Sequence, residues 1–287
     1  MVKRMKEVYL YGAGNIGRDI YGKIKNTCNV KGYLDSDPAK WGKTLDGVPI
    51  VGGIDSIPEL QYDEIIITIT TERDAVRNVL LGAGAPVDKI NTEYVNTYIG
   101  ARLNFIQDLS EVYKNDAEGF AVAEGGVFQG DFAKAINSNF PDATLYLFDT
   151  FEGFDVQDTF KENERGYSDS KSGRFSNTSI ELVMSKLPHP RKVVIRRGYF
   201  PKTTKGLEEE RFFFVNLDFD LYQPTLEGLR LFYPRLSNRG VILVHDFFTQ
   251  TFHGVARAIE DFEKEVGHCL IKLPIGDHCS IALVKTE

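Results

Sequence analysis

Apolar runs and helically spaced stretches alternate along the first third of the chain, with turn residues between them. The expected strands are Val8–Tyr11, the stretch NVKGYLD that ends at Asp35, and the continuous apolar run Glu64–Thr70. The expected helices are Ile16–Ile24 and residues 71–85, the second with glycine stop signals. A run that is apolar throughout is typical of a strand buried on both faces. This order predicts a small Rossmann-like βαβ domain over residues 1–95.

The rest of the chain begins a longer series of the same kind. A helix is expected at ARLNFIQDLSEVYKND, and it joins the two halves. The later apolar runs are GFAVAEGG, TLYLFDT, KVVIRR, RFFFVNLDFD, GVILVHDFF, CLIKLP and CSIALVK. Helical spacing between them occurs at SIELVMSKL, TLEGLRLFYPRL and GVARAIEDFEKEV. Alternating strands and helices with a closing pair of strands predict a doubly wound α/β domain over residues 96–287.

The composition of the chain indicates which binding partners and which cellular compartment to expect. The net charge is −7 without a dense Lys/Arg cluster, which disfavours a nucleic-acid partner. The apolar runs are far shorter than the roughly 18 residues of a membrane span. The chain passes from basic residues into a glycine turn without an apolar signal region, and its three cysteines have no C-x-x-C spacing. We therefore expect a cytoplasmic protein without a membrane partner, and leave open whether it forms a homo-oligomer.

The first glycine turn has the spacing of a nucleotide-binding motif. Gly12, Gly14 and Gly17 form G-x-G-x-x-G after a strand, and Asp35 ends the next strand about 20 residues on. In that context glycines permit the tight turn, the helix N-terminus attracts phosphate, and the acid binds a ribose hydroxyl. One reading is an NAD(P)-dependent oxidoreductase, although a full dinucleotide domain needs two such halves. The other reading is a glycine turn that serves packing alone.

The surrounding segment resembles a known domain. YLYGAGNIGRDIYGKI and KGYLDSDPAKWGKTLDGVPIVG are similar to the N-terminal nucleotide-sugar-binding domain of PglD-type sugar acyltransferases. The resemblance extends over residues 1 to about 60. It implies a nucleotide or sugar ligand for the first domain.

A second glycine turn follows the first strand of the second half. Glu124, Gly126 and Gly130 form E-x-G-x-x-x-G, and Asp149 ends the next strand. An acid there can accept hydrogen bonds from both ribose hydroxyls, while the glycine loop lets the backbone approach an adenosyl ligand. Thr150 and Phe151 follow Asp149 directly, and we assign them to the same site. Taken singly, the glycines could be ordinary turn residues and Asp149 a helix cap.

The stretch FFFVNLDFDLYQPT raises a question of charge. Asp218 and Asp220 are separated by Phe219 alone, and an extended strand would place both carboxylates on one face. Two anions so close repel each other unless a cation or a shared proton offsets them. The pair is therefore a candidate centre for the chemistry of the chain.

Several of these motifs occur in the order of a known family. NTSIELVMSKL, VVIRRGYFPKT, FVNLDFDLYQPTLEGLRLFYPRLSNRGVILVHDF and GVARAIEDF resemble the TylF-type methyltransferases, which include the macrocin O-methyltransferases. The resemblance covers residues 100 to about 265. It implies a seven-stranded class I methyltransferase domain that uses S-adenosyl-L-methionine. It also places the donor site at Glu124, Gly126, Gly130 and Asp149.

The same resemblance implies roles for the acids. Asp218 corresponds to a ligand of a divalent cation and Asp220 to the general base toward a sugar hydroxyl. The family has a pair of acids at the end of the next strand, where this chain has His245 and Asp246. An imidazole among oxygen ligands suits Mn²⁺, Fe²⁺ or Zn²⁺ better than Mg²⁺, so the identity of the metal stays open. His245 could act as base, as metal ligand, or as a strand-end histidine hydrogen-bonded to Asp218.

Residues 155–179 are polar and lack a periodic pattern, so we expect a loop that closes over the site or a solvated insertion. The resemblance implies a methyltransferase for a sugar or glycosylated small molecule, with O- and N-methylation both open. The alternatives are the NAD(P)-dependent oxidoreductase and a catalytically silent nucleotide- or sugar-binding protein.

Overall fold

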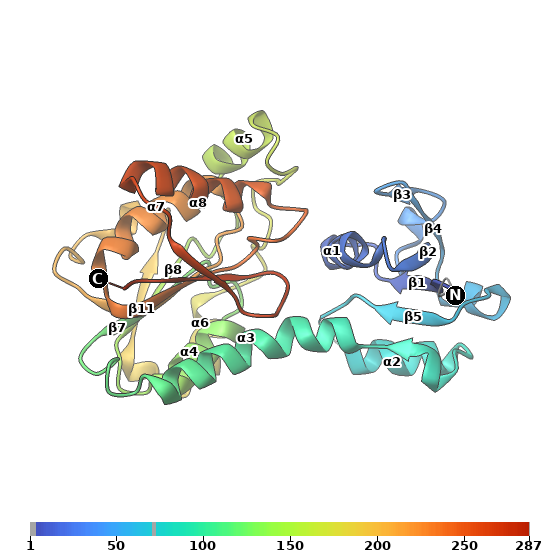
Figure 1. Cartoon of the computed structure of the whole chain (residues 1–287), viewed down its shortest axis with the longest axis horizontal. Helices are drawn as coiled ribbons and strands as arrows, with labels where there is room; N and C mark the ends of the chain where they lie inside the picture. Colours follow the sequence, from blue (N-terminus) through green and yellow to red (C-terminus); the bar gives the residue numbers. More distant parts are fainter. Residues whose placement is uncertain (1–3, 71–72, 287) are drawn as a thin grey trace. The chain divides into compact units, whose positions relative to one another are not determined.

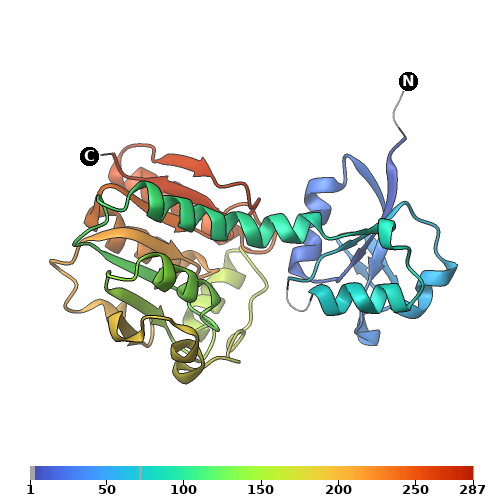
Figure 2. The same ribbon diagram turned by 90° about the horizontal axis from the view of Figure 1, so that it is seen from below.

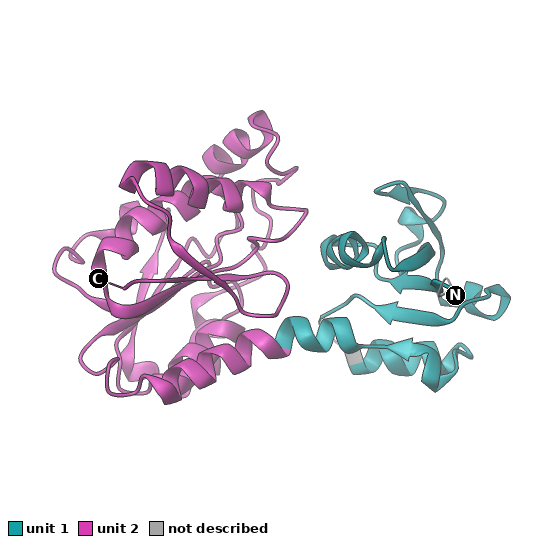
Figure 3. Cartoon of the chain, in the orientation of Figure 1, with its two compact units in different colours: residues 1–99 teal, residues 100–287 magenta. Residues whose placement is uncertain are grey.

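The computed structural model describes residues 4–70 and 73–286. The chain forms two compact units, residues 1–99 and 100–287, and the boundary lies inside the helix α3, Glu93–Val112 (Figure 3). Among the described residues, no helix combines the length and the apolar character that crossing a bilayer requires. Each unit has its own sheet and its own core, so the two are described separately.

The first unit is built on a six-stranded sheet in the order β3-β4-β2-β1-β5-β6. The strands are β1 Lys6–Tyr11, β2 Cys28–Leu34, β3 Thr44–Leu45, β4 Val48–Gly52, β5 Glu64–Ile67 and β6 Ile90–Asn91. All pairings are parallel except that of β3 with β4. The helices are α1 Asn15–Ile24 and α2 Arg73–Gly82. The predicted strand 64–70 therefore ends three residues early. Residues 71 and 72 of the predicted second helix lie outside the described residues.

Alternation along β1 explains how this sheet is covered. Val8 and Leu10 pack in one core with Ile20 of α1, whereas Tyr9 and Tyr11 pack in another with Leu80 of α2. Successive side chains of a strand point to opposite faces, so one helix covers each face. The Rossmann-like βαβ architecture predicted for this part of the chain is confirmed.

The second unit contains a seven-stranded sheet in the order β12-β13-β11-β10-β7-β8-β9. The strands are β7 Ala121–Gly125, β8 Leu145–Asp149, β9 Val193–Arg197, β10 Phe212–Leu217, β11 Leu236–Val244, β12 Ile271–Pro274 and β13 Ile281–Val284. The pairings of β13 with β11 and with β12 are antiparallel, and all other pairings of this sheet are parallel. The chain order reverses between β7 and β10, and in doubly wound sheets ligands bind at the carboxyl ends of the strands beside such a point.

Helices cover both faces of this sheet (Figures 1 and 2). Besides α3, the helices of this unit are α4 Asp131–Asn139, α5 Val156–Glu164, α6 Ile180–Lys186, α7 Tyr222–Phe232 and α8 His253–Val266, of which α5 packs on α7 and not on the sheet. One core contains Leu229 of α7 and Ile259 of α8. The other contains Ile106 of α3 and Ile136 of α4. The doubly wound α/β prediction is confirmed, with seven strands as expected.

The expectation that residues 155–179 lack secondary structure is wrong, because the segment contains α5. Asp155 caps this helix by accepting a hydrogen bond from the backbone N–H of Gln157. Glu162 is buried and accepts a hydrogen bond from the N–H of Tyr222 at 2.5 Å. The segment is therefore tied to Tyr222, the first residue of α7, which is separated from Asp220 by Leu221 alone.

Candidate active site

The second glycine turn packs directly against the acidic turn that follows β10. Gly126 has φ +80°, and a Cβ there would lie 2.0 Å from the carbonyl oxygen of Asp218. The N–H of Asp218 in turn donates to the carbonyl of Gly125 at 2.8 Å. Gly130 also has φ +80° and closes against the side chain of Val183. Only glycine fits at position 126, because both the backbone angle and the space exclude a side chain.

Asp149 ends β8 beside this turn, as the motif requires. Its carboxylate accepts hydrogen bonds from the N–H groups of Val127 at 2.7 Å, Phe128 at 3.0 Å and Phe151 at 2.7 Å. The hydroxyl of Thr150 donates to a backbone carbonyl within its own turn. A carboxylate has about four acceptor positions, so Asp149 keeps capacity for a further donor such as a ribose hydroxyl.

Asp218 and Asp220 both lie beyond the strand, because β10 ends at Leu217. Two carboxylates on one face of a strand are therefore not what the structure contains. The ring of Phe219 covers Gly125, whose added Cβ would lie 2.2 Å from it. Asp220 has φ +62°, a left-handed backbone conformation that is uncommon outside glycine. The turn thus presents the two acids while Phe219 anchors it.

The end of the neighbouring strand β11 adds two more side chains to this corner. The N–H of His245 donates to the carbonyl of Leu217 at 2.9 Å, which holds the two strand ends together. Its Nδ1 atom lies 3.0 Å from Asp218 Oδ1 and 3.1 Å from Asp246 Oδ2. Asp218, Asp220, His245 and Asp246 offer ligand atoms that all lie within 4.8 Å of one another. The structure therefore brings together the four residues singled out in the sequence.

The pKa values of the three carboxyl groups of this cluster are shifted in different directions. Burial, together with the charge and hydrogen bond of Asp246, raises the pKa of Asp220 well above its usual value. Burial opposes ionisation of Asp218 as well, but His245 and Arg102 hold its pKa below the usual range. His245 likewise lowers the pKa of Asp246 against the effect of burial. Without an added cation, a proton on Asp220 relieves the repulsion between neighbouring acids.

Arg102 is a member of the cluster that sequence reasoning missed. It lies on α3, and its Nη2 atom donates to Asp218 Oδ2 at 2.7 Å and to Asn216 Oδ1 at 2.9 Å. Its guanidinium carbon is 3.9 Å from the centre of the Phe132 ring. The only sequence signal was an arginine within an otherwise amphipathic helix, and that pattern usually indicates solvent exposure.

Asn216 links this arginine to the donor side of the site. It is fully buried, and its amide donates to Glu124 Oε1 at 3.0 Å. Glu124 Oε2 has no hydrogen-bond partner among the described residues, and burial raises the pKa of this carboxyl well above its usual value. A polar atom left unpaired in a buried position is costly unless a ligand satisfies it. Glu124 Oε2 is therefore a candidate contact for a ligand of this site.

Cys279 is the second member that sequence reasoning missed. The thiol is fully buried, and its sulfur lies 3.4 Å from His245 Nε2 and 3.5 Å from Asp246 Oδ1. The absence of C-x-x-C spacing gave no reason to select it. Its place beside His245 follows from the antiparallel pairing of β13 with β11.

The first glycine turn of the chain is held by hydrogen bonds to Asp35 and by tight packing within the turn. The Asp35 carboxylate accepts hydrogen bonds from the N–H of Ala13 at 2.8 Å and from Lys40 Nζ at 2.8 Å. A Cβ at Gly17 would lie 2.2 Å from the carbonyl oxygen of Gly12, whereas one at Gly14 meets nothing within 4 Å. Packing therefore requires Gly17 but leaves Gly14 free for another purpose.

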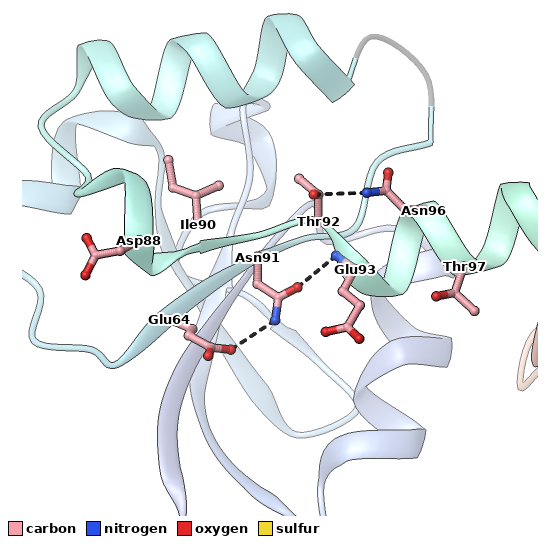
Figure 4. Close-up of a pocket in the computed structure, with 8 residues that line it drawn as sticks. All are labelled: Glu64, Asp88, Ile90, Asn91, Thr92, Glu93, Asn96 and Thr97. Carbon is pink, nitrogen blue, oxygen red and sulfur yellow. Dashed lines mark hydrogen bonds between the residues drawn. The ribbon is translucent and has the colours of Figure 1, made fainter.

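A pocket of about 370 Å³ lies in the first unit along the edge strand β6 (Figure 4). Its lining includes the acids Glu64, Asp88 and Glu93, and none of the predicted nucleotide-site residues. Asn91 donates to Glu64 Oε2 at 3.1 Å and accepts from the N–H of Glu93. Acidic walls repel phosphate, so this pocket is not the nucleotide site that the glycine turn predicts.

Comparison with known proteins identifies the family. Residues 86–276, more than half of the chain, match the family described as Macrocin-O-methyltransferase (TylF). The chain belongs to the TylF macrocin O-methyltransferase family. Residues 4–91 match a different family, C2185-like, N-terminal. No curated protein matches the sequence at a significant level.

Alignment with solved structures shows the fold class of the TylF-family region. The O-methyltransferase NovP aligns with a TM-score of 0.51 and 21% identity, over 65% of this chain and 80% of NovP. The calicheamicin methyltransferase CalS11 aligns with a TM-score of 0.53 and 19% identity, over 75% of this chain and 91% of CalS11. At such identities the similarity establishes the fold alone. The predicted class I methyltransferase fold is therefore confirmed.

Proposed function

We propose that this TylF-family chain is an S-adenosyl-L-methionine-dependent methyltransferase that acts on a hydroxyl of a sugar or sugar-bearing metabolite. The proposal depends on one observation, which is the contact between the glycine turn at Gly126 and the acidic turn that contains Asp218 and Asp220. The glycine turn at Gly126 packs on the backbone of Asp218, so a donor bound at the first would lie beside the acids of the second. NovP and CalS11 are methyltransferases of the same fold.

The donor site is proposed to comprise Glu124, Gly126, Gly130, Asp149, Thr150 and Phe151. Asp149 is placed to accept from the ribose hydroxyls through its remaining acceptor positions. The unpaired oxygen of Glu124 is placed to accept from the amino group of the donor, directly or through water. Gly130 caps α4, whose positive end favours a negatively charged group.

Asp220 is proposed as the general base that removes the proton of the acceptor hydroxyl. Its raised pKa makes it a stronger base than an ordinary aspartate once it is deprotonated. Asp218 and Asp246 are carboxylates at neutral pH because their pKa values are lowered. Arg102 orients Asp218, and His245 lies between the two carboxylates.

A divalent cation fits this corner. Ligands on neighbouring positions of an octahedral ion with bonds of about 2.1 Å lie roughly 3 Å apart. His245 Nδ1 lies 3.0 Å and 3.1 Å from the nearest oxygens of Asp218 and Asp246. The proposed ligands are Asp218, His245 and Asp246, and Mg²⁺ or Mn²⁺ would stabilise the negative charge that develops on the acceptor oxygen.

Calorimetric titration with S-adenosyl-L-homocysteine tests the donor site. We expect one binding event per chain, and an affinity roughly 10- to 100-fold lower in Asp149→Asn, because a charge-assisted hydrogen bond contributes about 1.5–3 kcal/mol. Asp142→Asn is the matched control, since Asp142 is exposed. Absence of binding by the wild-type protein would overturn the proposal. Donor binding without methyl transfer to a panel of glycosylated acceptors would favour a catalytically silent protein.

The first unit is proposed to bind the nucleotide or sugar portion of the acceptor at Gly12, Gly14, Gly17 and Asp35. Gly14 precedes the N-terminus of α1, and its open surroundings accommodate a side chain. Gly14→Asp places a carboxylate there, which should repel phosphate while leaving the fold intact. Titration with a nucleoside diphosphate sugar should detect binding by wild type and Gly14→Ala, and at least tenfold weaker binding by Gly14→Asp. Equal affinities in all three would exclude this site, and tight binding of NADH would favour the oxidoreductase.

A further inference from the structure

His245 lies between two different sets of donor atoms. Its Nδ1 atom faces the oxygens of Asp218 and Asp246, whereas its Nε2 atom faces the thiol of Cys279. An ion within bonding distance of one ring nitrogen cannot also bind the other, because the two nitrogens point in different directions. The imidazole therefore offers two separate positions for a cation, one rich in oxygen and one that includes sulfur.

The side that includes sulfur has the dimensions of a tetrahedral site. Bonds of about 2.3 Å to sulfur and 2.0–2.2 Å to nitrogen or oxygen give ligand separations of roughly 3.4–3.6 Å in a tetrahedron. Cys279 Sγ lies 3.4 Å from His245 Nε2 and 3.5 Å from Asp246 Oδ1. The ligand atoms of these three residues all lie within 4.8 Å of one another. Both separations from the sulfur therefore match those of two ligands of one tetrahedral ion, and the third ligand atom lies close enough to complete the set after a small adjustment.

The backbone holds Cys279 in this position independently of its side chain. The N–H of Cys279 donates to Asp277 Oδ1 at 2.8 Å, and its carbonyl accepts from the N–H of Phe248 at 3.1 Å. Ser280 follows with a hydroxyl that donates to Asp277 Oδ2 at 2.6 Å. The loop before β13 is therefore fixed against the segment that carries His245 and Asp246, which preorganises the three ligands.

We propose that His245, Asp246 and Cys279 bind a transition-metal ion of the Zn²⁺ class, with the fourth position left for water or the acceptor oxygen. Three protein ligands of mixed N, O and S type with one exchangeable position are the arrangement of catalytic zinc sites. A thiolate selects such an ion over Mg²⁺, which prefers oxygen. The inference rests on the proposed function in one respect, namely that the ion acts on the same acceptor oxygen.

Binding of the ion at this site exchanges bonds and protons and changes no oxidation state. The S–H bond of Cys279 breaks as the sulfur–metal bond forms, and the proton passes to the buffer. Water molecules of the hydrated ion leave as the imidazole and the carboxylate bind. At least one proton per chain should therefore be released when the ion binds, and a second one where His245 is protonated, because the ring nitrogen that binds the ion must be unprotonated.

Cobalt provides a readout that does not depend on activity. We expect titration of the full chain with Co²⁺ to produce a near-ultraviolet thiolate-to-cobalt charge-transfer band that saturates at one ion per chain. Zn²⁺ in equimolar amount should abolish the band, whereas Mg²⁺ in hundredfold excess should not. Cys279→Ser should lack the band and bind Zn²⁺ at least tenfold more weakly. Cys269→Ser, at an exposed thiol, is the matched control and should retain the band.

A second variant keeps the test decisive if Cys279→Ser fails to fold. The chain has three cysteines, so the double variant Cys28→Ser/Cys269→Ser leaves Cys279 as the only thiol, and it must retain the full band. Cobalt binding without a charge-transfer band, loss of the band in the double variant, or absence of cobalt binding would each overturn the inference. Donor calorimetry on the same samples reports on the proposed function separately.

Discussion

Arg102 and Asp218 form an ion pair of 2.7 Å between residues that are 116 positions apart in the chain. Both side chains are largely buried, with exposed fractions of 13% and 21%. The same guanidinium atom also donates to Asn216, which in turn donates to Glu124. The arginine is thus a fixed positive charge between the candidate donor site and the acidic corner.

Arg102→Ala should destabilise the protein strongly. Removal of one partner leaves the other charge of a buried pair without compensation, which costs about 3 kcal/mol. Urea denaturation monitored by circular dichroism measures the change in the free energy of unfolding. Arg197→Ala is the matched control, because Arg197 and Glu152 form an exposed pair and a change within about 0.5 kcal/mol is expected. Equal losses in the two variants would contradict the structural role assigned to Arg102.

Gly126→Ala should disrupt the junction of the two turns. The left-handed backbone alone costs roughly 1–2 kcal/mol for a residue with a side chain, and the new Cβ also displaces the carbonyl of Asp218. We expect a larger loss of stability than in Gly119→Ala, together with at least tenfold weaker donor binding. Gly119 has the same φ of +80° but open surroundings, so it isolates the backbone contribution. Similar losses in both variants would show that the contact with Asp218 contributes little.

Asp220→Asn should remove the general base without affecting donor binding. General-base catalysis contributes roughly 10²- to 10⁴-fold, so kcat should fall by about that factor. Because the pKa of Asp220 is raised, kcat of the wild type should increase with pH as this group deprotonates. Addition of the cation should move that increase to lower pH, since a positive charge favours the carboxylate. A pH profile of kcat that is the same in wild type and variant would contradict the role.

Glu124→Gln should stabilise the protein while weakening donor binding. The folded-state pKa of Glu124 is raised, so the folded protein binds the proton more tightly than the unfolded chain does. Its contribution to stability is complete below the unfolded pKa and is lost as pH rises through the folded pKa. The glutamine variant does not lose stability in this way as the pH rises. Its free energy of unfolding, measured by urea denaturation, should therefore exceed that of the wild type by an amount that grows between pH 5 and pH 8. The exposed Glu118→Gln should show no such trend.

Periodicity in the sequence predicted the sheets and most helices because the strands are short, apolar and separated by turn residues. The α5 helix was missed because its apolar residues are few, and its buried contacts are made by polar side chains such as Glu162. Spacing also placed the acids and His245 at strand ends, where a parallel sheet brings them together. Arg102 and Cys279 reach the same corner from distant segments, and no local pattern encodes that contact.

The acidic corner is attached to the rest of its unit by main-chain atoms. Asp218 bonds through its N–H to the carbonyl of Gly125, and His245 through its N–H to the carbonyl of Leu217. Neither bond involves the side chains that would do the chemistry. These two backbone bonds would therefore persist if those side chains were exchanged, although the buried carboxylate of Asp218 is also held by Arg102. A change of side chain at position 245 would thus leave the backbone connection between the two strand ends in place.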